Sequence, residues 1–322
     1  MTVIGIDIGG TTVKLGAVEN SEAIVYRDTR PSPHEPEQMT RLLAEMIRTA
    51  RERFPGAPAG ISTAGAMGFD GVELANLTEN YPYDPEELCA AAREAGVELC
   101  SWATSANFAA DISAQETALR AEIDRAAAMG CKAVRTDIYH EDVPHPYAEN
   151  VLAALRRLAD YAQEKDVVLI TENHGGYLVT PERLERLFQA VDHENFGLLC
   201  DFANFADANE DPARAVRLLK KHIRHVHVKD CHLLPGDRLY PGEGWYVTAG
   251  GDYWRCAIAG QGNLPLAQCM KTLAQSGYDG YLIQEFEGVE DCRMAIRAGL
   301  DYMKRLLAVL PRYAWQPPEN AE

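Results

Sequence analysis

The sequence lacks the features that mark membrane-spanning, secreted and nucleic-acid-binding proteins. It has no long apolar run, and its N-terminus has no basic stretch followed by an apolar one, so neither a membrane helix nor a signal peptide is predicted. Basic residues are scarce, because 31 Lys and Arg stand against 48 Asp and Glu and give a formal net charge of -17. Such a surface repels phosphate backbones and anionic lipid. We therefore expect a cytoplasmic protein that binds neither nucleic acid nor membrane.

Paired cysteines are also absent. The eight cysteines are scattered singly, without a Cys-x-x-Cys pair, and several lie in apolar runs, such as Cys200 in "FGLLCD". This pattern is typical of reduced, buried cysteines. The chain of 322 residues is 47% hydrophobic, which is enough to build a sizeable core in one large domain or two small ones.

One pattern recurs from residue 66 onward: the end of a helix, a glycine and a short apolar strand, as in "EAGVELCSWA" and "AMGCKAVRTD". Strands that alternate with helices predict a parallel sheet. The sequence predicts seven such strands, one fewer than a closed (β/α)8 barrel needs. The alternative to a barrel is a doubly wound open sheet. The predicted strands are Val72–Ala75, Val97–Ala103, Ala133–Asp137, Val167–Glu172, Phe196–Asp201, Ile223–Val228 and Tyr281–Glu285.

Four polar residues lie at or near the carboxyl ends of four predicted strands: Glu172, Asp201, His227 and Glu285. In a barrel these ends meet at the mouth, where active sites are found. Three carboxylates and one imidazole would repel one another there without a cation, whereas with one they form an ordinary divalent site. Taken singly, each residue could equally be a helix cap or a solvated loop residue.

A family resemblance rests on the motifs "GFDGVEL", "ITENHGG", "LLCDFAN", "HVHVKD", "GQGNLPL" and "GYDGYLIQEFEG". Over about residues 67–311 the chain resembles the xylose isomerase-like TIM barrels, within their sugar phosphate isomerase/epimerase group. The resemblance implies a (β/α)8 TIM-barrel-like fold and a divalent metal held by Glu172, Asp201, His227 and Glu285. Mn²⁺ or Mg²⁺ is favoured, and Co²⁺ and Zn²⁺ stay open.

Two positions depart from that family's usual pattern. Asn204 stands where several epimerases have His, and the loop Gly260-Gln261-Gly262 stands where Gly-Glu-Gly is common. Both departures leave the substrate open.

The N-terminal stretch "VIGIDIGGTTVKLGAVE" resembles the first β-hairpin of the ROK sugar kinases, whose Gly-Gly-Thr turn faces ATP phosphate. The likeness continues through a predicted helix, Pro36–Phe54. The catalytic Asp motif and the Cys-rich zinc motif of that family do not follow, so kinase activity is not expected. We divide the chain into a kinase-like fragment (1–66), the barrel (67–311) and a tail (312–322). The fragment either replaces the first β/α unit of the barrel or adds a separate layer.

The predicted chemistry is isomerisation or epimerisation of a sugar or sugar derivative. A metal that chelates adjacent carbonyl and hydroxyl oxygens acidifies the carbon-bound proton between them, and a carboxylate can remove and return it through an enediolate. Glu172 and Glu285 are the candidate catalytic residues. Alternatively, Glu285 is only a ligand, and Glu287 or a water molecule transfers the proton.

Further residues are candidates for substrate binding. They are His174, Asn204, Lys229, Arg135 and Trp245. Trp245 lies in a connection from Cys231 to Asn263 that is long enough to cover the barrel mouth. Its aromatic rings could stack on a sugar or simply pack on one another.

Two other classes of function stay open. A lyase, such as a dehydratase of an inosose or a keto acid, begins with the same proton abstraction but expels a hydroxyl. A non-catalytic sugar-binding protein would have lost activity with its first barrel unit. In each case the expected partner is a small carbohydrate, and homo-oligomer formation is left open.

Overall fold

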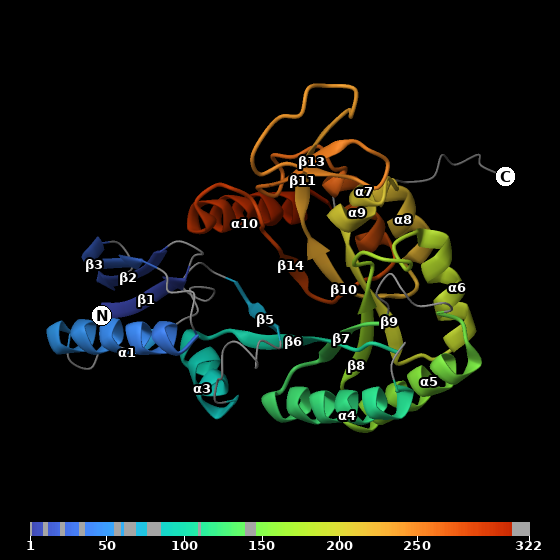
Figure 1. The fold of residues 1–322 in the computed structure, drawn as a ribbon, viewed down its shortest axis with the longest axis horizontal. Helices are drawn as coiled ribbons and strands as arrows, with labels where there is room; N and C mark the ends of the chain where they lie inside the picture. The colour runs from blue at the N-terminus through green and yellow to red at the C-terminus, as the bar shows by residue number, and fades with distance from the viewer. Residues whose placement is uncertain are drawn as a thin grey trace. The chain divides into compact units, whose positions relative to one another are not determined.

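The structure is a computed structural model, and it describes residues 2–8, 12–19, 23–31, 36–54, 59–60, 69–75, 85–108, 111–138 and 146–310. The chain divides into two compact units, Met1–Leu99 and Cys100–Glu322, whose elements are labelled in Figure 1.

The first unit contains a four-stranded sheet in the order β3-β2-β1-β4. β1 is antiparallel to β2, β2 is antiparallel to β3, and β4 is parallel to β1. Among the described residues these strands form a sheet of their own, so the N-terminal fragment adds no strand to the parallel sheet. The elements are β1 (Thr2–Ile8), β2 (Thr12–Glu19), β3 (Ala23–Pro31), α1 (Pro36–Arg53), β4 (Ala59–Gly60), β5 (Gly71–Ala75) and α3 (Pro85–Ala95).

Helix α1 matches the predicted helix Pro36–Phe54 and buries Met46 and Ala50 from its apolar side. The Gly-Gly-Thr turn at residues 9–11, on which the kinase resemblance depends, lies outside the described residues.

The second unit alternates strands and helices. β6 begins at the boundary between the units and continues into the second one. The elements are β6 (Glu98–Ser105), α4 (Ile112–Met129), β7 (Ala133–Asp137), α5 (Glu149–Glu164), β8 (Val168–Glu172), α6 (Pro181–Val191), β9 (Phe196–Asp201), α7 (Phe202–Asp207), α8 (Pro212–Leu219), β10 (Ile223–Val228), β11 (Asp230–Leu234), β12 (Tyr246–Val247), β13 (Tyr253–Ala257), α9 (Leu266–Gln275), β14 (Leu282–Gln284) and α10 (Cys292–Val309).

The parallel sheet has the strand order β14-β10-β9-β8-β7-β6-β5. These are the seven predicted strands, taken in chain order without a reversal. A doubly wound sheet would reverse its order at a switch point, so that alternative is wrong. The seven strands form a nearly closed parallel barrel with alternating helices, and the predicted TIM-barrel class is confirmed.

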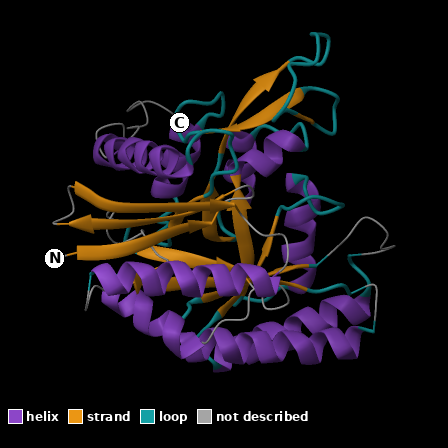
Figure 2. Ribbon diagram, turned by 60° about the vertical axis from the view of Figure 1, so that its left-hand side comes forward, coloured by secondary structure: helices purple, strands orange, loops and turns teal. Residues whose placement is uncertain are grey.

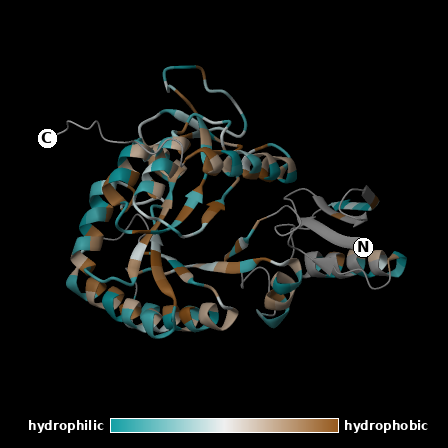
Figure 3. Cartoon of the chain, turned by 180° about the vertical axis from the view of Figure 1, so that it is seen from behind, coloured by the Kyte–Doolittle hydropathy of each residue, from teal (hydrophilic) through white to brown (hydrophobic). Residues whose placement is uncertain are grey.

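The helices of the second unit, drawn in purple in Figure 2, bury apolar residues, as α5 and α6 show. α5 buries its predicted stripe completely, because the residues from Val151 to Ala162 at helical spacing are at most 5% exposed. Figure 3 shows hydrophilic residues (teal) alternating with apolar residues (brown) along the helices of the second unit, as expected for helices with one buried face. Gly130 ends α4 in the left-handed conformation (φ 81°), as the helix–glycine–strand pattern predicts.

The long connection after β10 is not an irregular loop. It folds into a small antiparallel sheet in the order β11-β13-β12. Its aromatic rings contact one another, with centroid separations of 5.5 Å both for Tyr240 and Tyr253 and for Tyr246 and Trp254. In the described part of the chain, no helix is both long and apolar enough to cross a bilayer.

Candidate metal and catalytic site

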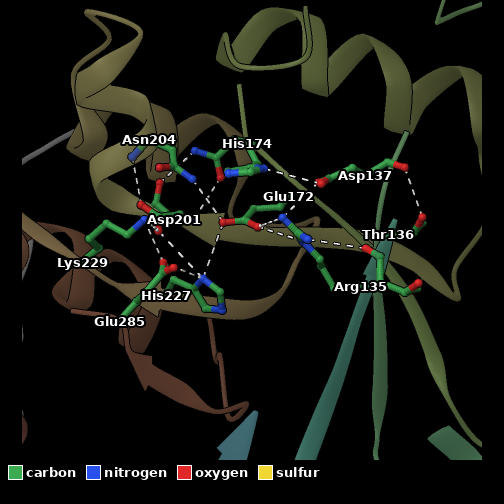
Figure 4. A network of polar contacts seen from close by, with 12 residues as sticks. Arg135, Thr136, Asp137, Glu172, His174, Asp201, Asn204, His227, Lys229 and Glu285 are labelled. Carbon is green, nitrogen blue, oxygen red and sulfur yellow. Dashed lines mark hydrogen bonds and ion pairs between the residues drawn. The ribbon is translucent and has the colours of Figure 1, made fainter. Parts of the chain in front are cut away.

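The barrel strands bring the four predicted strand-end residues to one place (Figure 4). Glu172 ends β8, Asp201 ends β9, His227 lies on β10, and Glu285 directly follows β14. The parallel register sets His227 opposite Asp201. One ligand atom from each of the four side chains lies within 4.8 Å of the others.

The four side chains differ in how deeply they are buried. Asp201 is fully buried, and the side chains of Glu172 and His227 are 4% and 7% exposed, whereas that of Glu285 is 31% exposed. His227 Nδ1 lies 3.2 Å from Glu285 Oε2 and 3.5 Å from Glu172 Oε1. Glu285 is therefore the acidic group of the four that solvent reaches most easily.

Lys229 supplies a buried positive charge on one side of the site. Its Nζ lies 2.9 Å from Glu285 Oε2, 3.4 Å from Asp201 Oδ2 and 3.3 Å from Glu287 Oε2. Burial alone would lower the pKa of Lys229, but the three carboxylates raise it well above its usual value. The lysine therefore stays charged and balances the acidic groups.

Arg135 supplies a positive charge on the opposite side of the site. Its Nε donates to Glu172 Oε2 at 2.9 Å, and its guanidinium also lies 3.1 Å from Asp137 Oδ1. Asn204 Nδ2 donates to the second oxygen of Glu172 at 3.1 Å. Both oxygens of Glu172 are thus held by donors from the protein itself.

Asn173 joins the ends of two strands. Its Nδ2 donates to the carbonyl oxygen of Asp201 at 2.8 Å, and its Oδ1 accepts from the backbone N–H of Asp201 at 2.9 Å. Asp201 in turn caps α7, because its Oδ1 accepts from the backbone N–H of Asn204 at 2.9 Å. These bonds fix the direction of Asp201 and leave its Oδ2 facing the site.

His174 lies just beyond Glu172 on the loop that follows β8. Its side chain is 56% exposed, and its Nδ1 lies 3.5 Å from Asp137 Oδ2. The hydrogen bond to Asp137 and the charge of Glu172 raise the pKa of His174 above its usual value, although burial opposes the shift. His174 is therefore a candidate proton donor at the edge of the site.

The pKa values of the carboxylates are shifted in opposite directions. Burial raises the pKa of Asp201 to about 7, with Lys229 opposing the shift. Burial would also raise the pKa of Glu285, but the imidazole of His227, 3.2 Å away, and the charge of Lys229 hold it far below its usual value. The pKa of Glu172 is likewise lowered, since His227 and Arg135 outweigh its burial. Glu172 and Glu285 are therefore both ionised at neutral pH.

The donor set fits a divalent cation. Three carboxylates and one imidazole are ligands that Mg²⁺, Mn²⁺ and related cations accept. Asp201 Oδ2 and Glu285 Oε2 are buried and accept no hydrogen bond from the described residues. These two oxygens face Lys229 at ion-pair distance, so a bound cation would share them with the lysine.

The structure brings four of the five residues predicted to bind substrate to this cluster. His174, Asn204, Lys229 and Arg135 contact its carboxylates or Asp137. Trp245 instead packs in the small sheet, with its ring centroid 6.5 Å from that of His232 and 5.4 Å from the guanidinium carbon of Arg255.

Sequence reasoning missed two residues of the site. Asp137 ends β7, so the same strand-end rule that selected Asp201 could have found it. Asn173 carried no signal beyond its place next to Glu172, because its role depends on which strand lies beside β8.

Comparisons with known proteins agree with this architecture. The family model described as xylose isomerase-like TIM barrel matches residues 61–306. Among curated proteins, an inosose dehydratase of Clostridium botulinum (strain Eklund 17B / Type B) is 26% identical over 251 residues, which cover 70% of this chain and 80% of that protein.

Two solved structures show the same fold at low identity. A xylose isomerase-like TIM barrel protein from Mycobacterium smegmatis in complex with magnesium has a TM-score of 0.62 at 18% identity and covers 87% of this chain and 92% of its own. A D-psicose 3-epimerase with D-tagatose from Clostridium cellulolyticum H10 has a TM-score of 0.59 at 17% identity and covers 76% and 91%. Because the family model spans most of the sequence, this chain belongs to the xylose isomerase-like TIM barrel family.

Proposed function

We propose that this protein is a metal-dependent lyase that removes the proton next to the carbonyl of a polyhydroxylated ketone and eliminates water. Proton abstraction next to a carbonyl is also the first step of the isomerase or epimerase chemistry expected from the sequence. The difference between the two mechanisms lies in what happens after the proton has left.

The unequal surroundings of Glu172 and Glu285 carry the proposal. Glu285 is partly exposed and ionised, so it can meet a substrate proton. Glu172 is 4% exposed, and Arg135 and Asn204 donate to both of its oxygens. Hydrogen bonds to the charged form of a carboxylate disfavour its protonation. One base fits elimination, whereas epimerisation needs a second group that returns the proton from the other face.

His174 supports the elimination step. Glu285 takes the proton from the carbon beside the carbonyl, and the electron pair of that C–H bond forms a C=C bond. The C–O bond of the hydroxyl on the next carbon breaks, and that hydroxyl leaves as water with a proton from His174. The product is the enol of a 1,2-diketone. Asp137, at 3.5 Å, orients the imidazole for this transfer.

Glu172, Asp201, His227 and Glu285 would hold the divalent cation. When bound, the cation supplies positive charge that polarises the substrate carbonyl and acidifies the neighbouring C–H. The curated relative, an inosose dehydratase, acts in the same class of reaction by its name.

Epimerisation is the second candidate function. Glu172 and Glu285 approach the same imidazole nitrogen from different strands, at 3.5 and 3.2 Å. Two carboxylates on either side of a substrate carbon are what a two-base epimerase uses.

The test uses the purified protein with Mn²⁺ and proton NMR in heavy water, on an inosose, D-tagatose and D-psicose. We expect C–H exchange together with a rise in ultraviolet absorbance from the conjugated enol. Exchange with a change of configuration and no loss of water would favour the epimerase. No exchange with any substrate would contradict both functions.

The kinase resemblance of residues 1–66 remains a sequence-based prediction without a catalytic role. Gly10→Val should leave metal-dependent turnover unchanged if the protein stays folded. Sugar-dependent ATP hydrolysis that this change abolishes would contradict the prediction.

A further inference from the structure

Glu285 opens the segment 285–291, which links β14 to α10 and has no regular secondary structure. The side chain of Glu285 is 31% exposed, and it contacts Lys229 and His227. A catalytic base must be held close to the geometry of the reaction, since a misplacement of about 1 Å can cost about 10²-fold in rate. The groups that fix this segment therefore matter for the proposed chemistry.

Strand β13 and the turn before it support this segment. The backbone N–H of Glu287 donates to Cys256 Sγ at 3.2 Å, and Arg255 Nη2 lies 3.7 Å from Glu290 Oε1. A Cβ added at Gly244 would lie 2.8 Å from Val289 Cγ1, so the backbone of the turn packs closely against the segment. β13 is the central strand of the small sheet, between β11 and β12, and is therefore itself held on both sides.

The ion pair between Arg255 and Glu290 is incomplete. Its 3.7 Å separation exceeds hydrogen-bond length. Arg255 Nε and Glu290 Oε2 are both buried, and neither forms a hydrogen bond within the part of the chain that the structure describes. Nε and Nη2 are the two donors on one edge of a guanidinium, and such an edge can bind both oxygens of a carboxylate in parallel. A shift of about 1 Å brings Nη2 and Oε1 to hydrogen-bond distance, and the cost of leaving buried polar atoms unpaired favours that shift.

Trp245 sets the plane of this guanidinium. The guanidinium carbon of Arg255 lies 5.4 Å from the centroid of the Trp245 ring, at cation–π distance. Arginine stacks on aromatic faces and keeps its in-plane donors free for a carboxylate. Trp245 therefore leaves the donor edge of Arg255 available to Glu290.

We propose that Arg255 is a positioning residue for Glu285: it holds the segment 285–291 through Glu290, in a state where Nε and Nη2 donate to both carboxylate oxygens. The inference rests on the proposed function for the role of Glu285 as the base. It adds a residue of the small sheet, outside the cluster of strand-end residues, on which the position of that base depends.

The first test measures how firmly the segment is held, without any substrate. Backbone hydrogen–deuterium exchange of residues 285–291 is followed by mass spectrometry in the wild type, Arg255→Ala and Arg255→Lys. We expect about 10-fold faster exchange in both variants, because lysine keeps the charge but cannot donate through a planar pair of N–H groups. Exchange in α9 is the internal control and should not change. Wild-type exchange in Arg255→Lys would overturn the two-bond pair, and wild-type exchange in Arg255→Ala would overturn the support itself.

The second test uses Mn²⁺ affinity, because Glu285 is also a proposed ligand. Removing a positive charge near a cation site should by itself strengthen cation binding. Positioning predicts the opposite, a loss of about 10-fold in Arg255→Ala. Arg238→Ala, which removes an exposed arginine from the same connection, is the matched control and should not lower the affinity. Unchanged or tighter Mn²⁺ binding in Arg255→Ala would overturn the inference, as would an equal loss in the control.

A double variant shows whether the two side chains act as one unit. Glu290→Gln should also weaken Mn²⁺ binding, and Arg255→Ala/Glu290→Gln should be no weaker than the weaker single variant, because both changes remove the same interaction. Losses that multiply in the double variant would mean that Arg255 does not act through Glu290.

Turnover separates this inference from the proposed function. If the wild type exchanges substrate C–H protons, Arg255→Ala should lower kcat by about 10–100-fold at saturating Mn²⁺, with little change in KM. An unchanged kcat would overturn the inference and leave the reaction standing. If no substrate reacts with the wild type, the proposed reaction fails, and amide exchange and Mn²⁺ affinity still decide whether Arg255 positions Glu285.

Discussion

The two sides of the site contain similar groups but hold them differently. On the Arg135 side, Glu172 is buried and accepts hydrogen bonds from arginine and asparagine at both oxygens. On the Lys229 side, Glu285 is partly exposed and contacts a single lysine and the imidazole. The same type of side chain is therefore buried and held by hydrogen bonds on one side, and partly exposed on the other, where we propose that it acts as the base.

This difference shows why the count of acidic residues does not define the chemistry. Both glutamates lie at the carboxyl ends of strands of the same barrel, and both are ionised. What separates them is exposure, because the side chain of Glu172 is 4% exposed and that of Glu285 is 31% exposed. Substitutions can perturb the two sides of the site one at a time.

The largest effect is expected for Glu285→Gln. The amide oxygen can still coordinate a cation but cannot accept the proton, so turnover should fall by about 10²–10⁴ and stay low at saturating Mn²⁺. Asp201→Asn removes a ligand charge but no base, so excess Mn²⁺ should restore more of its rate. Steady-state kinetics at equal folded fraction measures both. Equal rescue of the two variants would make Glu285 a ligand only and direct the search for the base to Glu172, His174 or Lys229.

Removing the cation of each side should affect stability unequally. Lys229→Met leaves Asp201, Glu285 and Glu287 without their shared counter-charge, and removing one partner of a buried ion pair costs about 3–5 kcal/mol. Urea unfolding measures the loss. Because a divalent cation can replace the missing charge, Mn²⁺ should stabilise Lys229→Met more than the wild type. Arg135→Met, whose partner Glu172 keeps Asn204, serves as the comparison; equal losses in both variants would remove the distinction between the sides.

The pH dependence of the metal-free protein tests Asp201. Its folded pKa, about 7, lies above the unfolded value of roughly 3.9. The protonated form therefore adds stability that is complete below about pH 4 and is lost as the pH rises toward 7. Glu172 and Glu285, with lowered pKa values, add stability above roughly pH 4.3 and lose it as the pH falls.

Asp201→Asn removes only the first of these contributions. The stability of the metal-free variant relative to the wild type should therefore increase as the pH rises from 4 to 7, by an amount on the order of 4 kcal/mol. Urea unfolding across this pH range gives the difference. A difference between the two proteins that does not change with pH would show that Asp201 is ionised in the folded protein throughout.

The smallest expected effect is that of Asn173→Ala. It leaves a buried N–H and a buried carbonyl of Asp201 without partners, at a cost of about 1–3 kcal/mol. Because Asn173 orients Asp201, the affinity for Mn²⁺ should fall as well. Asn204→Ala removes one hydrogen bond to Glu172 and should lower the affinity less. Chemical denaturation measures the stability of each variant, and Mn²⁺ titration measures its affinity. Unchanged Mn²⁺ affinity in Asn173→Ala would mean that Asp201 keeps its direction without the asparagine.

Much of the barrel could be predicted from the sequence because its strands are short apolar runs that follow helix-ending glycines. β7, β9 and β10 match the predicted bounds, and β8 differs by one residue. Buried parallel strands have this continuous apolar character, since both faces are covered. The strand-end rule then located Glu172, Asp201 and His227 without any knowledge of contacts.

The hydrogen-bond partners could not be predicted in the same way. Arg135 was a candidate for substrate binding, but its pairing with Glu172 and Asp137 could not be foreseen, because it depends on the registers of β7 and β8. The small sheet β11–β13 was also missed, because a connection rich in glycine and aromatic residues has no clear strand periodicity. Its cross-strand pairs, such as Cys231 with Cys256, join residues far apart in the chain.

The most direct test of the unequal roles is the exchange of substrate C–H protons in heavy water by Glu172→Gln and Glu285→Gln, each saturated with Mn²⁺. With Glu285 as the single base, Glu172→Gln should still exchange the proton next to the carbonyl, within about 10-fold of the wild-type rate, whereas Glu285→Gln should lose about 10²–10⁴. If Glu172→Gln abolished exchange while Glu285→Gln retained it, or if both lost it equally, the two glutamates would not be a fixed element and a base, and the account would be wrong.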